Sequence, residues 1–346
     1  MNRIVQRFAL AARVLRHGET NNRASFDDIP PLTPEQVDEA RSFFPMEKFF
    51  IFGHARSGTT LLARLIQVHP EVYCSWQAHF FTRSPTLVSL VSDLEVSEWL
   101  SRRSNRWNRG KDLSAVVMRA ASDFILEREA RRAGKTVVGD KSPNNLMNGD
   151  SVRSLKSIYP DASLIFIVRD GRDTILSHRL QKFIDLPDQL AAEDLAIRND
   201  LINDPQPFLS GERSIFTSPG LHRAAHGWVR NVKETVNQGK DLFAKNFLSM
   251  RFEDLLDDPF SVIQQAWNLL GVDSTLPELE AAITQEMSSN PDADWQRQTK
   301  ADLADKIRKG VPGSWQDVFT AQDKQIFKEI AGDSLIEWGY EQDHNW

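Results

Sequence analysis

Residues 49–66 form the segment that most constrains the fold of this chain. They combine a short apolar run at 49–52, a loop bounded by Gly53 and Gly58, and a stretch with the spacing of an apolar helix face. Such a run has the composition of a buried parallel strand. The loop amides and the positive end of the helix dipole would together bind an anion. The sequence therefore predicts a phosphate-binding loop at the carboxyl end of a buried strand.

The loop resembles the G-x-x-x-x-G-K-[ST] pattern of nucleoside triphosphatases, with one difference. Thr59 stands at the position of the lysine that reaches the β- and γ-phosphates, and the cationic residue, Arg56, comes earlier. This arrangement favours a nucleotide with a single 5′-phosphate-linked group over a triphosphate and argues against ATP hydrolysis. The alternative is a glycine turn that only joins strand to helix.

Composition excludes several classes of protein. The chain has 346 residues, 40% of them hydrophobic and 26% charged, with a formal net charge of −6. The negative charge argues against nucleic-acid binding, and a single cysteine, Cys74, excludes an internal disulfide or a multi-thiolate metal site. No apolar run is long enough to span a bilayer. We expect a cytoplasmic protein whose basic, amphipathic segment 1–16 forms a packed helix, with weak membrane contact as the open alternative.

Strand and helix patterns alternate along the chain. We expect strands at 49–52, 136–139, 163–168 and 247–252, with helices between them. Alternation of this kind predicts an α/β fold, a three-layer sandwich with a mostly parallel central sheet and a P-loop-like phosphate-binding loop. We divide the chain into an N-terminal helical extension at 1–45 and a single α/β domain at 46–346. The polar stretch 186–220 is interpreted as a lid excursion within that domain.

Two further cationic elements predict a second phosphate site. The strand at 163–168 runs into Arg169, and Ser177 follows eight positions later, about two helical turns on. Arg308, Lys309 and Gly310 form a late basic element whose glycine leaves amides open to an anion. One loop for a 5′-phosphate and two elements for another phosphate describe a bisphosphorylated nucleotide.

With these motifs the chain resembles the sulfotransferases that use 3′-phosphoadenosine-5′-phosphosulfate (PAPS), over roughly residues 46–340. The resemblance implies that the 5′-phosphosulfate is bound by Arg56, Ser57, Gly58, Thr59 and Thr60. It implies that Arg169 and Ser177 bind the 3′-phosphate. Lys141 lies in the Asp-Lys-Ser-Pro segment 140–143, where the family carries a strand-end lysine. Further matches are the segment 251–255 before Asp258-Pro259, and Arg308, Lys309 and Gly310 ahead of 313–320.

The reaction that the resemblance implies is sulfuryl transfer from PAPS to a hydroxyl or amine of a small-molecule, lipid or carbohydrate acceptor. It resembles phosphoryl transfer, with in-line attack and negative charge developing on the leaving phosphate. Arg56, the loop amides and Lys141 would stabilise that charge, so no metal is required. The product is adenosine 3′,5′-bisphosphate. The sequence carries no signal for the acceptor's identity or for the oligomeric state.

The general base departs from the family pattern. Members that act on steroids and phenols resemble one another in a histidine shortly after the strand-end lysine, where this chain has Pro143. Members with a Lys-Ser-Pro segment more often use a glutamate downstream of the loop helix, and the matching residue here is Gln77. His79 titrates near neutrality and would face the same side as Gln77 on an extended segment, so we predict it as the base. The alternative is a partly buried core histidine.

Two other functions stay open at this point. The first is a nucleotide-binding protein of the same fold without turnover, which the amide of Gln77 keeps in play. The second is a P-loop kinase-like enzyme, which would need an ATP-linked lysine and a Walker B aspartate that the sequence does not show.

Overall fold

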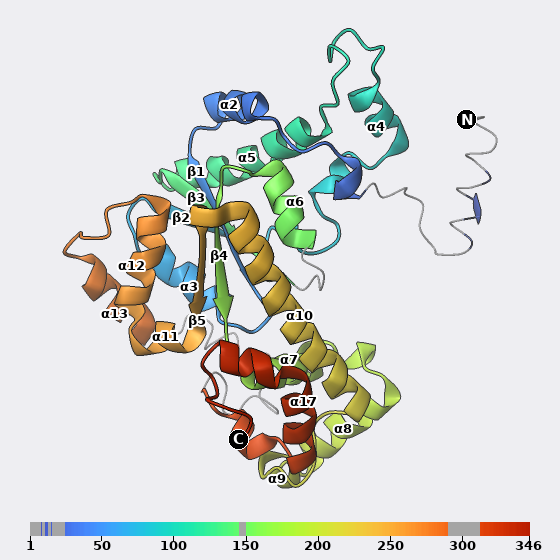
Figure 1. The fold of residues 1–346 in the computed structure, drawn as a ribbon, viewed down its shortest axis with the longest axis vertical. Helices are drawn as coiled ribbons and strands as arrows, with labels where there is room; N and C mark the ends of the chain where they lie inside the picture. The colour runs from blue at the N-terminus through green and yellow to red at the C-terminus, as the bar shows by residue number, and fades with distance from the viewer. Residues whose placement is uncertain (1–7, 9–10, 13–14, 16–24, 145–149, 290–311) are drawn as a thin grey trace.

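A five-stranded parallel sheet organises the molecule (Figure 1). The computed structural model describes residues 8, 11, 12, 15, 25–144, 150–289 and 312–346. The strands lie in the order β2-β3-β1-β4-β5 and every neighbouring pair is parallel. Their bounds are β1 (Glu47–Gly53), β2 (Val72–Trp76), β3 (Val137–Lys141), β4 (Ser163–Val168) and β5 (Phe247–Arg251). The expected α/β fold with a mostly parallel sheet is confirmed.

Alternate side chains of the central strands enter two separate cores. Phe50 and Phe52 of β1 pack into one core, whereas Phe49 and Ile51 pack into the other. Successive residues of a strand point to opposite faces, so an apolar run such as 49–52 requires cover on both sides. Helices supply that cover and complete the predicted three layers.

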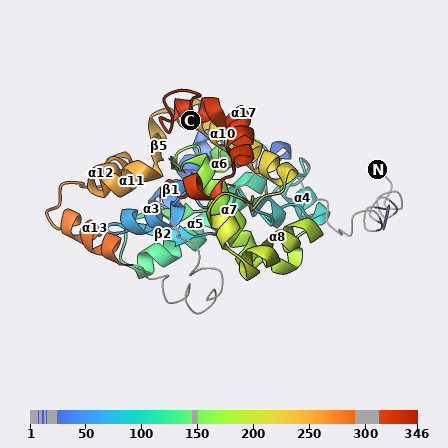
Figure 2. The same cartoon turned by 90° about the horizontal axis from the view of Figure 1, so that it is seen from below.

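One face is covered by α3 (Thr59–Ile66), α12 (Pro259–Leu270) and α13 (Leu279–Ser288). The other is covered by α5 (Ser114–Arg132), α6 (Asp150–Ile158) and α10 (Ser218–Phe243), with α17 (Ala321–Glu337) packed on α10. Figure 2 shows α12 and α13 on one side of the strands and α10 and α17 on the other. The remaining elements are η1 (Phe26–Asp28), α2 (Pro34–Phe43), η2 (Leu87–Leu90), α4 (Leu94–Ser101), α7 (Gly171–Asp185), η3 (Pro187–Gln189), α8 (Ala192–Asn203), α9 (Gln206–Leu209), η4 (Ala244–Asn246), α11 (Phe252–Asp257) and α16 (Trp315–Val318).

Helix ends follow the signals in the sequence. Thr33 caps α2 and forms a capping box with Gln36, next to a proline at the first helical position. Asp258 caps the start of α12, and Gly271 closes it with a φ of +72°. These local cues fix where the covering helices begin and end.

Two segments differ from their expected secondary structure. Strand β2 is absent from the predicted set, because Val72–Trp76 is a half-exposed edge strand with polar residues between its apolar ones. Segment 186–220, for which a lid role but no helices were predicted from the sequence, contains helices α8 and α9 and the start of α10. Leu201 and Phe208 from this segment are buried in the same core as Phe50 and Phe52. Likewise Val37 of α2 belongs to the same core.

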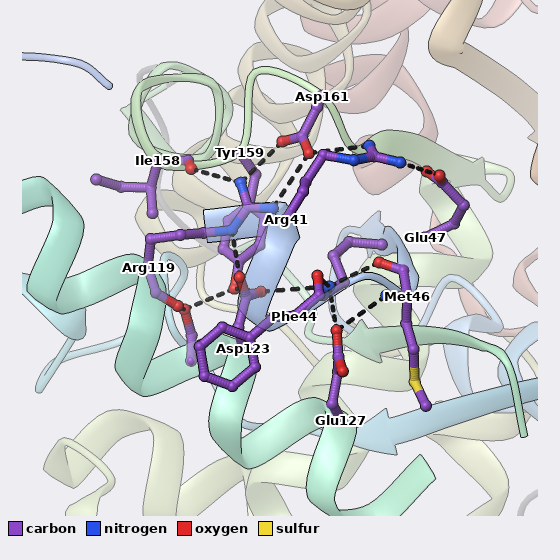
Figure 3. A network of polar contacts seen from close by, with 12 residues as sticks. Arg41, Phe44, Met46, Glu47, Arg119, Asp123, Glu127, Ile158, Tyr159 and Asp161 are labelled. Carbon is purple, nitrogen blue, oxygen red and sulfur yellow. Dashed lines mark hydrogen bonds and ion pairs between the residues drawn. The ribbon is translucent and has the colours of Figure 1, made fainter. Parts of the chain in front are cut away.

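A buried polar network lies at the end of the sheet where the parallel strands begin, which we call the amino edge (Figure 3). The guanidinium of Arg119 donates to the carboxylates of Asp123 and Asp161, and the ammonium of Lys48 donates to the carboxylate of Glu127. Tyr159 donates its hydroxyl to Asp123 at 2.9 Å. The network joins the start of β1 to α5 and to the chain entering β4.

Candidate functional site

The loop between β1 and α3 is shaped by a residue that must be glycine. Gly58, the N-cap of α3, has a φ of +88°, and a Cβ there would lie 2.1 Å from Cδ2 of Phe252. Only glycine adopts this backbone freely and leaves room for the aromatic ring. Arg56 also has a positive φ, of 76°. Phe252 therefore presses directly on the predicted phosphate loop.

Ser57, inside the same loop, has its hydroxyl buried. Its Oγ has no hydrogen-bond partner among the described residues. Its amide donates to the carbonyl of His54 at 3.0 Å, which closes the turn. A buried hydroxyl without a partner in a loop at a helix N-terminus is suited to an anionic ligand.

Lys141, the last residue of β3, reaches this loop from the neighbouring strand. Its ammonium donates to Oγ1 of Thr60, on the first turn of α3, at 3.3 Å. The ammonium also lies 5.0 Å from the ring centroid of Trp76, and the residue is fully buried. The strand-end lysine and the loop hydroxyl are thus brought together.

Arg169 reaches the loop from the other side, directly after β4. Its Nη1 donates to the carbonyl of Arg56 at 3.4 Å, and its guanidinium lies over the ring of Phe252 at 5.0 Å. Its Nε is buried without a partner in the described part of the chain. Ser177 joins through Arg56, whose Nε donates to the serine hydroxyl at 3.2 Å. Since β3, β1 and β4 are adjacent, their carboxyl ends bring all these groups to one place.

The predicted basic element Arg308, Lys309 and Gly310 lies outside the described residues. The chain that follows it is anchored at the site by Asp173 of α7. The amides of Gly313 and Trp315 and the hydroxyl of Ser314 all donate to this carboxylate. Burial raises the pKa of Asp173, against the opposing effect of Arg169, whose Nη2 lies 4.0 Å from the carboxylate. Sequence reasoning missed Asp173, although it stands four residues after Arg169 in the same motif.

His79 and Gln77 line a pocket of about 370 Å³ beside the loop. The other lining residues are Ala55, Thr82, Arg83, Ser84 and Pro143. The extended segment expected here is wrong: the φ angles of Gln77 and His79 are 57° and 53°, so strand alternation does not apply beyond β2. The turn that these angles create nevertheless places both residues on the pocket.

The imidazole of His79 is held by Thr82 and is kept neutral by its surroundings. Its Nδ1 lies 2.8 Å from Oγ1 of Thr82. Partial burial lowers the pKa of His79, and the positive charges of Arg83 and Lys141 lower that pKa further. A neutral imidazole at pH 7 can accept a proton, which a protonated one cannot.

Asp140 and Asn144, on either side of Lys141, received no role from the sequence: Asp140 stands in the quoted Asp-Lys-Ser-Pro segment, and Asn144 follows it. Asn144 pairs with Gly53 in both directions: its side-chain Oδ1 accepts from the glycine backbone amide, and its backbone amide donates to the glycine carbonyl, each at 3.0 Å. Burial raises the pKa of Asp140 to about 6. The Asn144 contacts fix the end of β1 against the end of β3.

The described residues contain neither a metal-binding cluster nor a membrane span. No group of three or more His, Cys, Asp or Glu side chains there could hold a metal ion. No helix in that part of the chain has the length and apolar character needed to cross a membrane.

Comparisons with known proteins find sulfotransferases. A region of the chain is 32% identical over 171 residues to protein-tyrosine sulfotransferase A of Caenorhabditis elegans, which is 46% of this chain and 42% of the worm protein. The Drosophila melanogaster protein-tyrosine sulfotransferase is 32% identical over 133 residues, 38% of this chain and 25% of the fly protein. The chain thus spans less than half the length of these curated relatives.

A mouse sulfotransferase crystallised with PAP has 19% sequence identity and a TM-score of 0.45, over 88% of this chain and 90% of the mouse chain. The model of the sulfotransferase family matches residues 48–276, which include β1 from its second residue onward, β2 to β5, and every site residue described above up to Phe252. This match covers most of the chain. The chain belongs to the sulfotransferase family.

Proposed function

We propose that this protein transfers a sulfuryl group from PAPS to a hydroxyl or amine of a small-molecule, lipid or carbohydrate acceptor by in-line displacement. The single observation that carries the proposal is the pair of buried polar atoms, Ser57 Oγ and Arg169 Nε, that have no partner among the described residues. A buried polar group left unpaired costs about 1–3 kcal/mol. Both atoms belong to residues of the phosphate-loop region, so a nucleotide phosphate would supply the missing acceptors.

The donor side of the reaction falls to Arg56, Lys141 and the loop amides. PAPS supplies an activated sulfuryl group whose departure leaves negative charge on a phosphate oxygen. Lys141 already donates to Thr60 at the first turn of α3, so its ammonium needs no large movement to stabilise that charge. Arg169 and Ser177, which both contact Arg56, would bind the 3′-phosphate. The predicted contribution of Arg308, Lys309 and Gly310 belongs to the same proposal.

The acceptor side falls to His79. When Nδ1–H donates to Thr82, the lone pair of Nε2 is available to take the acceptor proton. The lowered pKa of His79 keeps this form populated at neutral pH. Gln77 lines the same pocket and would hydrogen-bond the acceptor without accepting its proton.

The pocket lining offers several groups that would orient an acceptor. Gln77, His79, Thr82, Arg83 and Ser84 present hydrogen-bonding groups, and Arg83 adds an exposed positive charge. That charge would attract an acceptor with an anionic group near its hydroxyl. The two curated relatives are named for protein tyrosine, so a tyrosine peptide with acidic neighbours belongs in the panel of acceptors to be tested.

The test combines a binding and a transfer measurement. Calorimetric titration with adenosine 3′,5′-bisphosphate should show one site, and ³⁵S-labelled PAPS should label an acceptor from a panel of sugars, lipids, phenols and acidic tyrosine peptides. Absence of nucleotide binding would contradict the proposal. Binding without transfer to any acceptor would favour the second candidate, a nucleotide-binding protein without turnover, for which the amide of Gln77 speaks.

The organisation of the chain completes the proposal. A helical extension at 1–45, a single domain at 46–346 and a lid role for 186–220 are retained as predictions, as is the cytoplasmic location. The ion pair Arg179–Asp194, with 2.7 Å between Nη2 and Oδ1, connects α7 of the site to α8 of the proposed lid. That contact gives the lid segment a direct connection to the helix that carries Ser177.

A further inference from the structure

The turn at residues 77–79 has a backbone that its sequence does not explain. Gln77 and His79 both have positive φ angles, 57° and 53°, and neither is glycine. A left-handed backbone is unfavourable for an ordinary residue, so it persists only where the surrounding structure imposes it. Strain of this kind concentrates at functional sites. The turn follows β2 directly and lines the pocket beside the phosphate loop.

The end of β3 engages every amide of this turn. Three successive amides, at residues 77–79, donate to three successive residues, 140–142. The bonds run from Gln77 N to the carbonyl of Lys141 at 2.8 Å, from Ala78 N to Oδ1 of Asp140 at 3.0 Å, and from His79 N to Oγ of Ser142 at 2.9 Å. The first bond continues the sheet ladder, but the other two depend on side chains.

Those two side chains are themselves connected. The hydroxyl of Ser142 donates to Oδ2 of Asp140 at 2.5 Å while its oxygen accepts from His79 N. Both residues are only 1% exposed. The carboxylate therefore holds Ala78 directly and orients the serine that holds His79. A linked polar unit of this kind rigidifies the groups that it joins, because each bond fixes the geometry of the next.

We propose that Asp140 and Ser142 are positioning residues, which impose the left-handed backbone of the 77–79 turn and thereby set His79 against the phosphate loop. Lys141 lies between them in sequence, so one short segment would orient the leaving-group lysine and the acceptor-side histidine together. The role given to His79 rests on the proposed function, whereas the hydrogen bonds that define the unit do not.

The first test follows the turn itself. Ser142→Ala removes the acceptor for His79 N with little change in volume, and Asp140→Asn removes the charge while keeping the shape. Both should accelerate hydrogen exchange of the Ala78 and His79 amides at least tenfold. Ser142→Ala, which changes no charge, should also move the imidazole pKa of His79, followed by NMR, up toward its ordinary value. Ser142→Ala alone decides the test if Asp140→Asn does not fold.

Matched controls come from elsewhere in the core. Ser334 is a buried serine of α17 whose hydroxyl has no partner in the described part of the chain, and Asp123 is a buried carboxylate of the amino-edge network. Ser334→Ala and Asp123→Asn should leave amide exchange at the turn and the titration of His79 unchanged. The positioning role is wrong if the amides of the turn exchange as slowly in Ser142→Ala as in the native protein. It is also wrong if these amides exchange as fast in the two controls as in Ser142→Ala.

The second test separates this inference from the proposed function. With PAPS and a working acceptor, both variants should lower kcat at least tenfold while the Kd for adenosine 3′,5′-bisphosphate changes less than threefold. An unchanged kcat would overturn the positioning role, and so would a loss of nucleotide affinity that matches the loss of kcat. If the native protein transfers no sulfuryl group, the proposed function fails, yet the exchange and titration results still decide whether the unit holds the turn.

Discussion

Two buried arginines lie at opposite ends of the sheet: Arg119 at the amino edge, where the strands begin, and Arg169 at the carboxyl edge, where they end. They differ in how many of their N–H donors have hydrogen-bond partners. At the amino edge, Arg119 donates through Nε to Asp123 at 2.6 Å, through Nη1 to Asp161 and a backbone carbonyl, and through Nη2 to Asp161 at 3.1 Å. At the carboxyl edge, Arg169 has a carbonyl contact at 3.4 Å, a carboxylate at 4.0 Å and an Nε without a partner among the described residues. Both side chains are almost fully buried.

From this difference we predict which buried charge serves folding and which serves a ligand. A buried charge that the protein itself satisfies holds elements together, and removing one partner leaves the others uncompensated. A buried arginine with incomplete partners keeps N–H donors that can form hydrogen bonds to a ligand. The amino edge is thus a structural joint, and the carboxyl edge is suited to bind an anion.

The largest expected effect is on stability at the amino edge. Arg119→Ala would leave the carboxylates of Asp123 and Asp161 without their main partner. Breaking a buried ion pair in this way costs about 3–5 kcal/mol, so we expect a large drop in the urea midpoint of unfolding. Nucleotide affinity, measured on the folded fraction, should not change. A loss below about 1 kcal/mol, the level of a surface pair, would break the comparison.

Arg169→Ala should show the reverse pattern. It removes donors that the protein uses incompletely, so its stability loss should be smaller than that of Arg119→Ala. A charged hydrogen bond to phosphate is worth about 1.5–3 kcal/mol, so the Kd for adenosine 3′,5′-bisphosphate should rise by roughly 10- to 150-fold. Calorimetry and urea unfolding on both variants complete the comparison. If Arg119→Ala and Arg169→Ala lose equal stability, the number of hydrogen-bond partners of a buried arginine does not distinguish a structural role from a ligand-binding role.

Gly58→Ala tests how tightly the carboxyl edge is built. The new Cβ would meet the ring of Phe252, and the positive φ adds backbone strain of about 1–2 kcal/mol. Gly271 supplies the control, because it has a φ of +72° and a Cβ added there would meet nothing within 4 Å. Gly271→Ala should show the strain alone, whereas Gly58→Ala should lose about 1–3 kcal/mol more through overpacking and weaken nucleotide binding. Identical stabilities would mean that Phe252 moves aside freely.

The basic residues at the carboxyl edge could be predicted to lie together because each one follows a predicted strand along the chain. Arg56, Lys141 and Arg169 each stand where a predicted strand ends, and the ends of parallel strands meet. The turn at Gln77 and His79 was not predictable in the same way. Its left-handed backbone is held by Asp140 and Ser142, more than sixty positions later, and residue types at the turn carry no sign of it.

The strand β2 and the helix α8 were also not predicted, and each has a cause in its own residues. The edge strand β2 has a polar residue, Ser75, and an exposed Trp76 where a buried strand would be apolar, so it lacks the signal of its neighbours. Helix α8 carries almost no amphipathic pattern, and Leu201 is its one buried residue. Neither element therefore carries the periodic pattern of apolar residues from which the other elements were predicted.

The smallest expected effect is a pH dependence at the site. His79 acts as a base only when neutral, so kcat/KM should fall as pH drops through the pKa of its imidazole. Because burial, Arg83 and Lys141 lower that pKa, the inflection should lie below the ordinary value of about 6.5. Below it, kcat/KM should drop about tenfold per pH unit, and His79→Gln should lower kcat/KM at pH 7 and remove this limb. Arg83→Gln removes one of the charges that lower the pKa, so the inflection should move upward. A profile that keeps its acid limb in His79→Gln would assign the limb to another group and return His79 to the role of a pocket-lining residue.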